Sequence, residues 1–201
     1  MDATSLRKYR VRKDSLTFKD QIKEWKLKHK GKRLPPYFLC YIRVFGMSQR
    51  GTNRFCFVKA PLKLVPRGAK PPVESVSEVL QSKLLTKIRQ NSQCFTDGCL
   101  SWESAAKKMK KTLKFEQVKH CRSQFTRKLR GKTKRGHSKV AGTQQIDKLW
   151  TWCKGFICGR VKTRINGLPN PQLYNQAYQY VWRKNNVEKD LFKLLATELQ
   201  K

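Results

Sequence analysis

The sequence predicts an α/β fold in which helices flank a mixed β-sheet. Two observations favour this class. Apolar, aromatic-rich runs at 37–46 and 54–60 are separated by a Gly- and Asn-containing turn, which is typical of a β-hairpin. Farther along the chain, short apolar runs alternate with segments of helical periodicity, which is typical of parallel βα units. The 201 residues are enough for one domain with a substantial core.

The elements after the hairpin follow from apolar spacing. Segment 61–72 is rich in proline and is expected to be a loop, whereas 73–88 carries valine, leucine and isoleucine at helical spacing. Further predicted strands are 92–97 and 114–120. Further predicted helices are 100–111, 143–158 with Thr143 as its cap, 172–185 after a turn at 165–171, and 187–199. This order suits an RNase H-like domain, and other mixed folds fit it as well.

Two strongly basic segments interrupt the pattern. Residues 7–36 end at the breaker Pro35-Pro36, and we expect a loop or insertion with one or two helical turns around 18–27. Residues 121–140 contain many cations and no acid, which predicts a solvated loop.

The charge of the chain points to a polyanionic partner. Lysine and arginine number 46 against 13 aspartates and glutamates, a formal net charge of +33. Nucleic acid is the polyanion that best neutralises such a charge. A membrane partner is not expected, because no apolar run reaches the roughly 18 residues of a spanning helix and no basic amphipathic stretch has a clean apolar face.

The seven cysteines are odd in number and stand mostly among apolar residues, which favours reduced thiols in an intracellular protein. A structural zinc site is the alternative. Its candidate ligands are Cys94, Cys99, Cys121, Cys153, Cys158 and His120, although the usual paired short spacing is absent.

Two carboxylates stand where they could serve phosphoryl transfer. Asp97 ends a predicted strand, and Asp147 lies on a predicted helix as the only acid between Glu116 and Glu188. Lys154 follows Asp147 by seven residues, close to two helical turns, so both project from one face. The residues alone leave simpler roles open, a turn or cap for Asp97 and an ion pair for Asp147.

Several motifs resemble the DDE transposases of the ISXO-like insertion-sequence group and their Merlin-type relatives. "MDATSLRKYR" is similar to the first family motif and "FLCYIRVFGMSQRGTNRFCFVKAP" to the family hairpin. "CFTDGCLSW" resembles the second motif, "VKHC" a segment that precedes the third, and "AGTQQIDKLWTWCK" the third motif itself, with an acid three residues before a tryptophan. These matches run in order along nearly the whole chain.

The resemblance implies a fold and a chemistry. It implies an RNase H-like catalytic domain over 1–186, a five-stranded mixed sheet with a truncated first strand, followed by a C-terminal helix over 187–201. It assigns Asp2, Asp97 and Asp147 as ligands of two Mg²⁺ or Mn²⁺ ions, with Lys154 and His120 assisting. The implied reaction is metal-dependent DNA strand cleavage and strand transfer, that is, DNA transposition.

The implied partners are transposon ends and target DNA, bound by a homodimer or higher oligomer. The expected location is intracellular, in the nucleus of a eukaryote or the cytoplasm and nucleoid of a bacterium. The basic segment is assigned to grip backbone phosphates through Arg122, Arg127, Lys128, Arg130, Lys132, Lys134, Arg135 and Lys139. Two alternatives stay open. One is an inactive truncated transposase, and the other is a non-catalytic basic nucleic-acid-binding protein, either a domesticated transposase remnant or a factor associated with the ribosome or chromatin.

Overall fold

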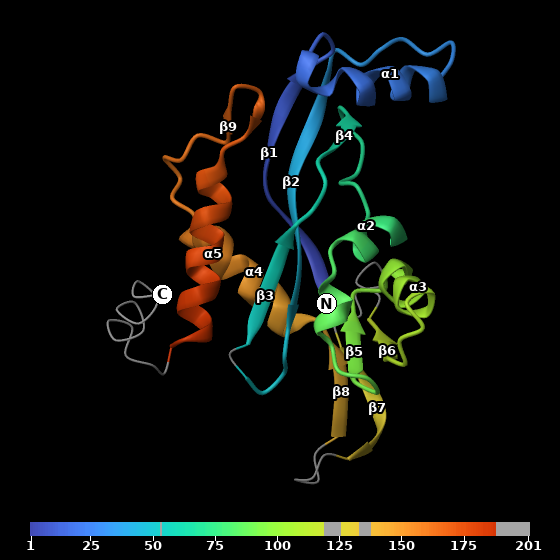
Figure 1. Cartoon of the computed structure of the whole chain (residues 1–201), viewed down its shortest axis with the longest axis vertical. Coiled ribbons are helices and arrows are strands. Elements are labelled where there is room, and N and C mark those ends of the chain that lie inside the picture. The colour runs from blue at the N-terminus through green and yellow to red at the C-terminus, as the bar shows by residue number, and fades with distance from the viewer. Residues whose placement is uncertain (53, 119–125, 133–137, 188–201) are drawn as a thin grey trace.

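The long hairpin of the sequence is the centre of an antiparallel sheet. The computed structural model describes residues 1–52, 54–118, 126–132 and 138–187. The sheet contains β1 (Asp2–Arg12), β2 (Tyr37–Ser48), β3 (Phe55–Lys59) and β4 (Lys63–Pro66). β2 is hydrogen-bonded to the other three, all antiparallel (Figure 1). β1 runs along most of β2, from the pair Asp2–Gly46 to the pair Arg12–Tyr37.

Two segments expected to be loops are partly strands. Residues 7–12 belong to β1, because Tyr9 and Val11 are buried in the core while the basic residues between them point outward. The helical turns expected around 18–27 are confirmed as a 3₁₀ turn (Leu16–Phe18) followed by α1 (Lys19–Lys28). The expected loop at 61–72 contains β4, whose apolar residues extend the edge of the sheet.

A parallel βαβ unit lies beside the start of β1. It consists of β5 (Gln93–Thr96), α3 (Leu100–Lys108) and β6 (Lys114–Gln117), close to the predicted bounds. The two strands form a separate two-stranded sheet. Among the described residues, the one backbone bond from β1 to this unit is donated by the Met1 amino group to the Phe95 carbonyl oxygen, at 2.6 Å.

The helix predicted over 73–88 is broken in two. α2 (Val76–Gln81) ends before Lys83, which adopts a left-handed conformation with φ of 55°, and a 3₁₀ turn (Leu84–Lys87) follows. The break lets both Leu84 and Leu85 enter the core, where they are fully buried.

The basic segment at 121–140 is not a plain loop. Its described residues form β7 (Thr126–Lys132) and β8 (Ser138–Gly142), an antiparallel pair whose second strand lies near β5 and β6 (Figure 1). Backbone pairing between strands does not need apolar side chains. A segment dominated by cations therefore lacks the apolar pattern from which strands are predicted.

Two long helices follow. They are α4 (Gln144–Phe156) and α5 (Pro171–Asn185), separated by the short pair β9 (Arg164–Ile165) and β10 (Leu168–Pro169). Both helices and the turn between them agree with the prediction. The expected helix at 187–199 lies almost wholly outside the described residues. Among the described helices, none has the length and apolarity to cross a membrane.

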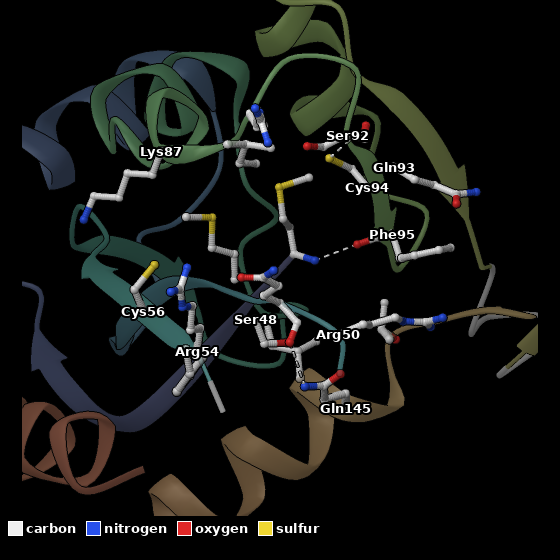
Figure 2. Close-up of a pocket in the computed structure, with 18 of the residues that line it drawn as sticks. Ser48, Arg50, Arg54, Cys56, Lys87, Ser92, Gln93, Cys94, Phe95 and Gln145 are labelled. Carbon is white, nitrogen blue, oxygen red and sulfur yellow. Dashed lines mark hydrogen bonds between the residues drawn. The ribbon is translucent and has the colours of Figure 1, made fainter. Parts of the chain in front are cut away.

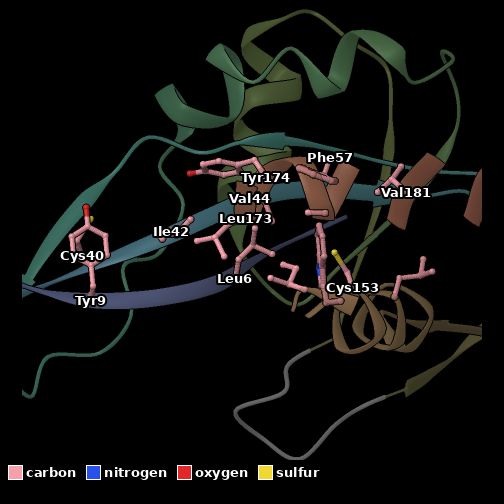
Figure 3. Close-up of a cluster of buried hydrophobic side chains, with 14 of the residues drawn as sticks. Leu6, Tyr9, Cys40, Ile42, Val44, Phe57, Cys153, Leu173, Tyr174 and Val181 are labelled. Atoms are coloured by element: carbon pink, nitrogen blue, oxygen red, sulfur yellow. The ribbon is translucent and has the colours of Figure 1, made fainter. Parts of the chain in front are cut away.

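The helices cover both faces of the sheet, so the α/β class with flanking helices is confirmed. α4 and α5 pack with one face through Leu149, Cys153, Leu173 and their neighbours (Figure 3). α2 and α3 cover the other face around Phe45. Of the tryptophans expected in the core, Trp102 and Trp150 are buried and Trp182 is half-buried.

Gly46, which pairs with Asp2 of β1, makes room for the Trp150 ring. A Cβ atom at Gly46 would lie 2.5 Å from ring atoms of Trp150, and Phe55 packs edge-on against that ring. Gly46→Ala is therefore expected to lower the free energy of unfolding by about 1–3 kcal/mol through overpacking. Urea unfolding would measure the change.

A matched control is available on α4. Gly155 is exposed with open space around its Cα, so Gly155→Ala is expected to stabilise the chain by about 0.5–1 kcal/mol through helix propensity. Equal effects of the two substitutions would contradict the close approach of Gly46 and Trp150.

Candidate metal-binding carboxylate site

The first carboxylate lies in the centre of the molecule. Asp2 begins β1 and pairs with Gly46 of β2. Asp2 is only 8% exposed, which is unusual for an aspartate. The long register between β1 and β2 fixes its backbone, because a shift of one residue would turn Leu6 and Val11 out of the core.

The second carboxylate follows β5. Asp97 leaves the strand directly before Gly98, whose φ of 93° turns the chain toward α3. Its Oδ1 atom accepts a hydrogen bond from the Cys99 backbone N–H at 3.4 Å. This weak bond engages one of the two carboxylate oxygens, so the turn role considered from sequence holds and Oδ2 can still bind a ligand.

The third carboxylate stands in the first turn of α4. Thr143 does not cap the helix through its side chain as expected. Its hydroxyl instead donates to Asp147 Oδ2 at 3.0 Å, one helical turn away. Thr143 is buried, so this bond orients the Asp147 carboxylate. A hydroxyl four residues before an acid is the sequence signal for this bond, and the same pattern also fits a helix cap.

The three carboxylates interact electrostatically. Burial first, and then the charges of Asp97 and Asp147, raise the pKa of Asp2 from 3.8 to about 7. The Met1 ammonium and a backbone hydrogen bond act in the opposite direction. Side chains that are 95 and 145 positions from Asp2 in the sequence are therefore near enough to destabilise its charge.

The Met1 ammonium is part of the same environment. It donates to Phe95 O, and burial lowers its pKa, whereas Asp2, Cys94, Asp97 and Asp147 raise it. A cation thus lies among the carboxylates. Sequence reasoning did not consider this group, because its position depends on β1 lying next to β5.

The donor chemistry fits a divalent cation, but the ligands are not preassembled. Within the described ranges, no three His, Cys, Asp or Glu side chains gather closely enough to hold a metal ion. Carboxylate oxygens are nevertheless the ligands that Mg²⁺ and Mn²⁺ prefer. The pKa of Asp2 is raised mainly by burial and in addition by repulsion from Asp97 and Asp147, and a bound dication would relieve that repulsion.

Other predicted site residues lie farther out or outside the described chain. Lys154 is exposed on α4, about 10 Å beyond Asp147 along the helix axis at ~1.5 Å per residue. His120, Arg122, Lys134 and Arg135 fall outside the described residues. The remaining assigned cations are on the basic hairpin, with Arg127, Lys128, Arg130 and Lys132 in β7 and Lys139 in β8.

The cysteines of the described chain are free thiols. Cys40, Cys94 and Cys153 are buried, whereas Cys158 is exposed. Burial raises the pKa of the Cys153 thiol to about 11, so it is protonated at neutral pH. The zinc alternative gains no support from the described ligands, and two of its candidates, His120 and Cys121, lie outside them.

Comparisons with protein-family models, curated proteins and solved structures find no match for this chain.

Proposed function

We propose that this chain is the catalytic domain of a DDE-type transposase, which cleaves DNA strands and transfers them with the help of divalent metal ions. The observation that carries the proposal is the raised pKa of Asp2, caused by burial and by Asp97 and Asp147. Carboxylates that raise one another's pKa are typical of functional sites. The three residues are those that the transposase resemblance assigns.

The arrangement of strands supports an RNase H-like fold for this domain. The antiparallel strands β3, β2 and β1 are followed by the parallel pair β5 and β6, and Met1 bonds to β5. With β1 beside β5, the order β3-β2-β1-β5-β6 would be the five-stranded mixed sheet that such a fold requires. Asp2 and Asp97 then stand on neighbouring strands.

The three carboxylates would hold two Mg²⁺ or Mn²⁺ ions, which supply an activated attacking oxygen and stabilise the leaving one. Asp2 must be ionised to bind a cation, so its raised pKa makes binding weaker at acidic pH. The Thr143 hydroxyl holds Asp147 in one orientation. Lys154, which is exposed on α4, would contact a DNA phosphate.

The charge distribution supports DNA as the substrate. The net charge of +33 would be offset by backbone phosphates. The hairpin of β7 and β8 extends from the sheet near β5, close to the strand that leads to Asp97 (Figure 1). Its cations would position DNA near the carboxylates without reading sequence.

Nicking of supercoiled DNA tests the proposal. The chain is expected to nick the DNA in Mg²⁺ or Mn²⁺, and Asp97→Asn to reduce the rate at least about 100-fold, since small displacements of catalytic groups have effects of that size. Asp20→Asn serves as the matched control, because Asp20 is exposed on α1, far from Asp2 (Figure 1). Equal loss in both variants would contradict a role for Asp97.

A non-catalytic nucleic-acid-binding protein is the second candidate. It is favoured by the large positive charge. Binding that weakens steeply between 50 and 200 mM salt, with no cleavage in either metal and no effect of Asp97→Asn, would select this function.

A further inference from the structure

The end of the sheet where β2 begins has one face packed against a helix and one face lined by exposed cations. There, β2 runs between β1 and β4 (Figure 1). Phe38 of β2 points to the packed face, where the Trp25 ring of α1 lies edge-on against it. The alternate residues Tyr37 and Leu39 point to the opposite face. α2 and α3 cover another part of that face, around Phe45.

Cations from both outer strands flank the apolar residues of this open face. We call it the tip face, and it consists of Arg10, Arg12, Tyr37, Leu39, Val65 and Arg67. The register places Arg10 of β1 and Val65 of β4 on either side of Leu39, and Arg67 directly follows β4. The arginines are exposed, whereas the apolar residues are half-buried. An apolar centre thus lies between two cationic borders.

Two of these arginines contact one aromatic ring. The guanidinium carbon of Arg10 lies 4.8 Å from the centroid of the Tyr37 ring, and that of Arg67 lies 5.7 Å from it. In the part of the chain that the structure describes, neither guanidinium has an ion-pair partner, whereas Arg12 pairs with Asp14 at 2.6 Å. Like charges held against one ring repel each other. An anion bound to both arginines would therefore stabilise this arrangement.

We propose that the tip face binds a single strand of DNA. The phosphates of the strand contact Arg10 and Arg67, and its bases lie against Tyr37, Leu39 and Val65. Surfaces that bind single strands combine positive charge along the backbone with aromatic or guanidinium groups on which bases stack. The choice of DNA over RNA rests on the proposed function. Binding at the tip face itself requires neither a metal ion nor the three carboxylates.

The apolar centre of the tip face favours a single strand over other polyanions. A duplex keeps the faces of its bases stacked inside, so its phosphates would contact the arginines while Tyr37 and Leu39 stayed uncovered. An acidic polypeptide would neutralise the arginines, but its carboxylates carry no ring that stacks on Tyr37. A single strand supplies phosphates and free base faces together.

Other cations of the chain lie far from the tip face. Arg54 and Lys87 line a cavity beside Ser48, at the opposite end of β2 (Figure 2). An extended strand from Tyr37 to Ser48 is about 35 Å long. Such cations attract any nucleic acid through charge. The decisive substitution in the tip face therefore removes a ring and leaves the charge unchanged.

Fluorescence anisotropy of a labelled oligothymidylate, measured on the full chain in EDTA, tests the proposal. Tyr37→Ala is expected to weaken binding of a strand of about 12 nucleotides at least about 5-fold, because the loss of one stacked base has an effect of this size. Tyr37→Phe keeps the ring and is expected to bind as the wild type does. Tyr178→Ala is the matched control, because Tyr178 is 41% exposed on α5, which packs on the other face of the sheet. It is expected to keep its affinity.

A second variant keeps the test decisive if Tyr37→Ala does not fold. Arg67 is exposed beyond the end of β4, so Arg67→Ala leaves the core intact. It is expected to lower the slope of log Kd against log salt concentration by about 0.7, the value for one phosphate contact with a single strand. Arg160→Ala removes an exposed cation outside the tip face and is expected to leave the slope unchanged.

Several outcomes would overturn the proposal. They are an unchanged affinity of folded Tyr37→Ala, an equal loss of its affinity for a duplex of the same length, and equal slopes for Arg67→Ala and Arg160→Ala. Tighter binding of oligouridylate than of oligothymidylate would overturn DNA as the ligand, and displacement of the strand by poly-glutamate of equal charge and concentration would select an acidic polypeptide. EDTA removes the metal ions, so these results are separate from the nicking test of the proposed function.

Discussion

Glu78→Ala is expected to lower the free energy of unfolding by about 3–5 kcal/mol, because it leaves a buried guanidinium without its counter-ion. Arg43 is 2% exposed and Glu78 is 6% exposed. Arg43 Nη2 lies 2.6 Å from Glu78 Oε1, and Lys63 Nζ lies 2.6 Å from Oε2. The carboxylate also accepts from Ser75 in the capping box of α2, so its loss affects both the sheet and the helix.

Glu24 on α1 provides the matched control. Its carboxylate pairs with Lys28 at the same distance of 2.6 Å, but both side chains are exposed. Glu24→Ala is expected to change stability by less than about 1 kcal/mol, as surface pairs do. Urea unfolding of both variants measures the difference, and similar values would show that Arg43 finds another partner or water.

The pH dependence of the Glu78 variant has a defined sign. Burial by itself raises the pKa of the carboxyl, but Lys63, Ser75 and Arg43 together hold it below the ordinary 4.5. A lowered folded-state pKa contributes stability above 4.5 that is lost as pH falls through the folded value. The difference between wild type and Glu78→Ala is therefore expected to narrow below pH 4.5.

Apolar periodicity predicted most elements, and its failures have physical causes. β1 alternates Arg and Lys with Tyr9 and Val11, which is a period of two, but a register shift between Ser5 and Arg7 interrupts the alternation. The basic character of the segment then suggested a loop. The break at Lys83 left no sign either, because lysine rarely takes a positive φ and its neighbours keep helical spacing.

The sequence predicts which residues form the candidate site, but it does not predict how those residues affect one another. A strand followed by Asp97 and a helix beginning before Asp147 can both be predicted from local sequence. The effect of these residues on Asp2 depends on β1 lying beside β5, a long-range contact that a single sequence does not contain. The ion pair of Arg43 and Glu78 was missed for the same reason, since 35 residues separate its members.

Asp2→Asn is expected to stabilise the folded chain at pH 8, by up to about 4 kcal/mol. Burial, with Asp97 and Asp147, raises the pKa of Asp2 from 3.8 to about 7, and each pKa unit corresponds to roughly 1.4 kcal/mol. The folded state therefore keeps a proton between pH 4 and 7 that the unfolded state has released. The free energy of unfolding of the wild type therefore decreases as pH rises through this window. In Asp2→Asn this decrease is absent, because asparagine does not titrate.

A divalent cation is expected to stabilise the wild type at pH 8 more than it stabilises Asp2→Asn. At pH 8, Mg²⁺ bound by the ionised carboxylates would relieve their repulsion, so saturating Mg²⁺ should raise the wild-type Tm more than that of Asp2→Asn. Asp20→Asn, at an exposed position on α1, should respond to pH and Mg²⁺ as the wild type does. A wild-type stability that is flat from pH 4 to 8 would mean that neither burial nor the neighbouring carboxylates raise the pKa of Asp2. An equal Mg²⁺ response in both proteins would mean that Asp2 does not share a cation with its neighbours. The carboxylates would then lie too far apart for one cation site, and the DNA-cleaving function would lose its main support.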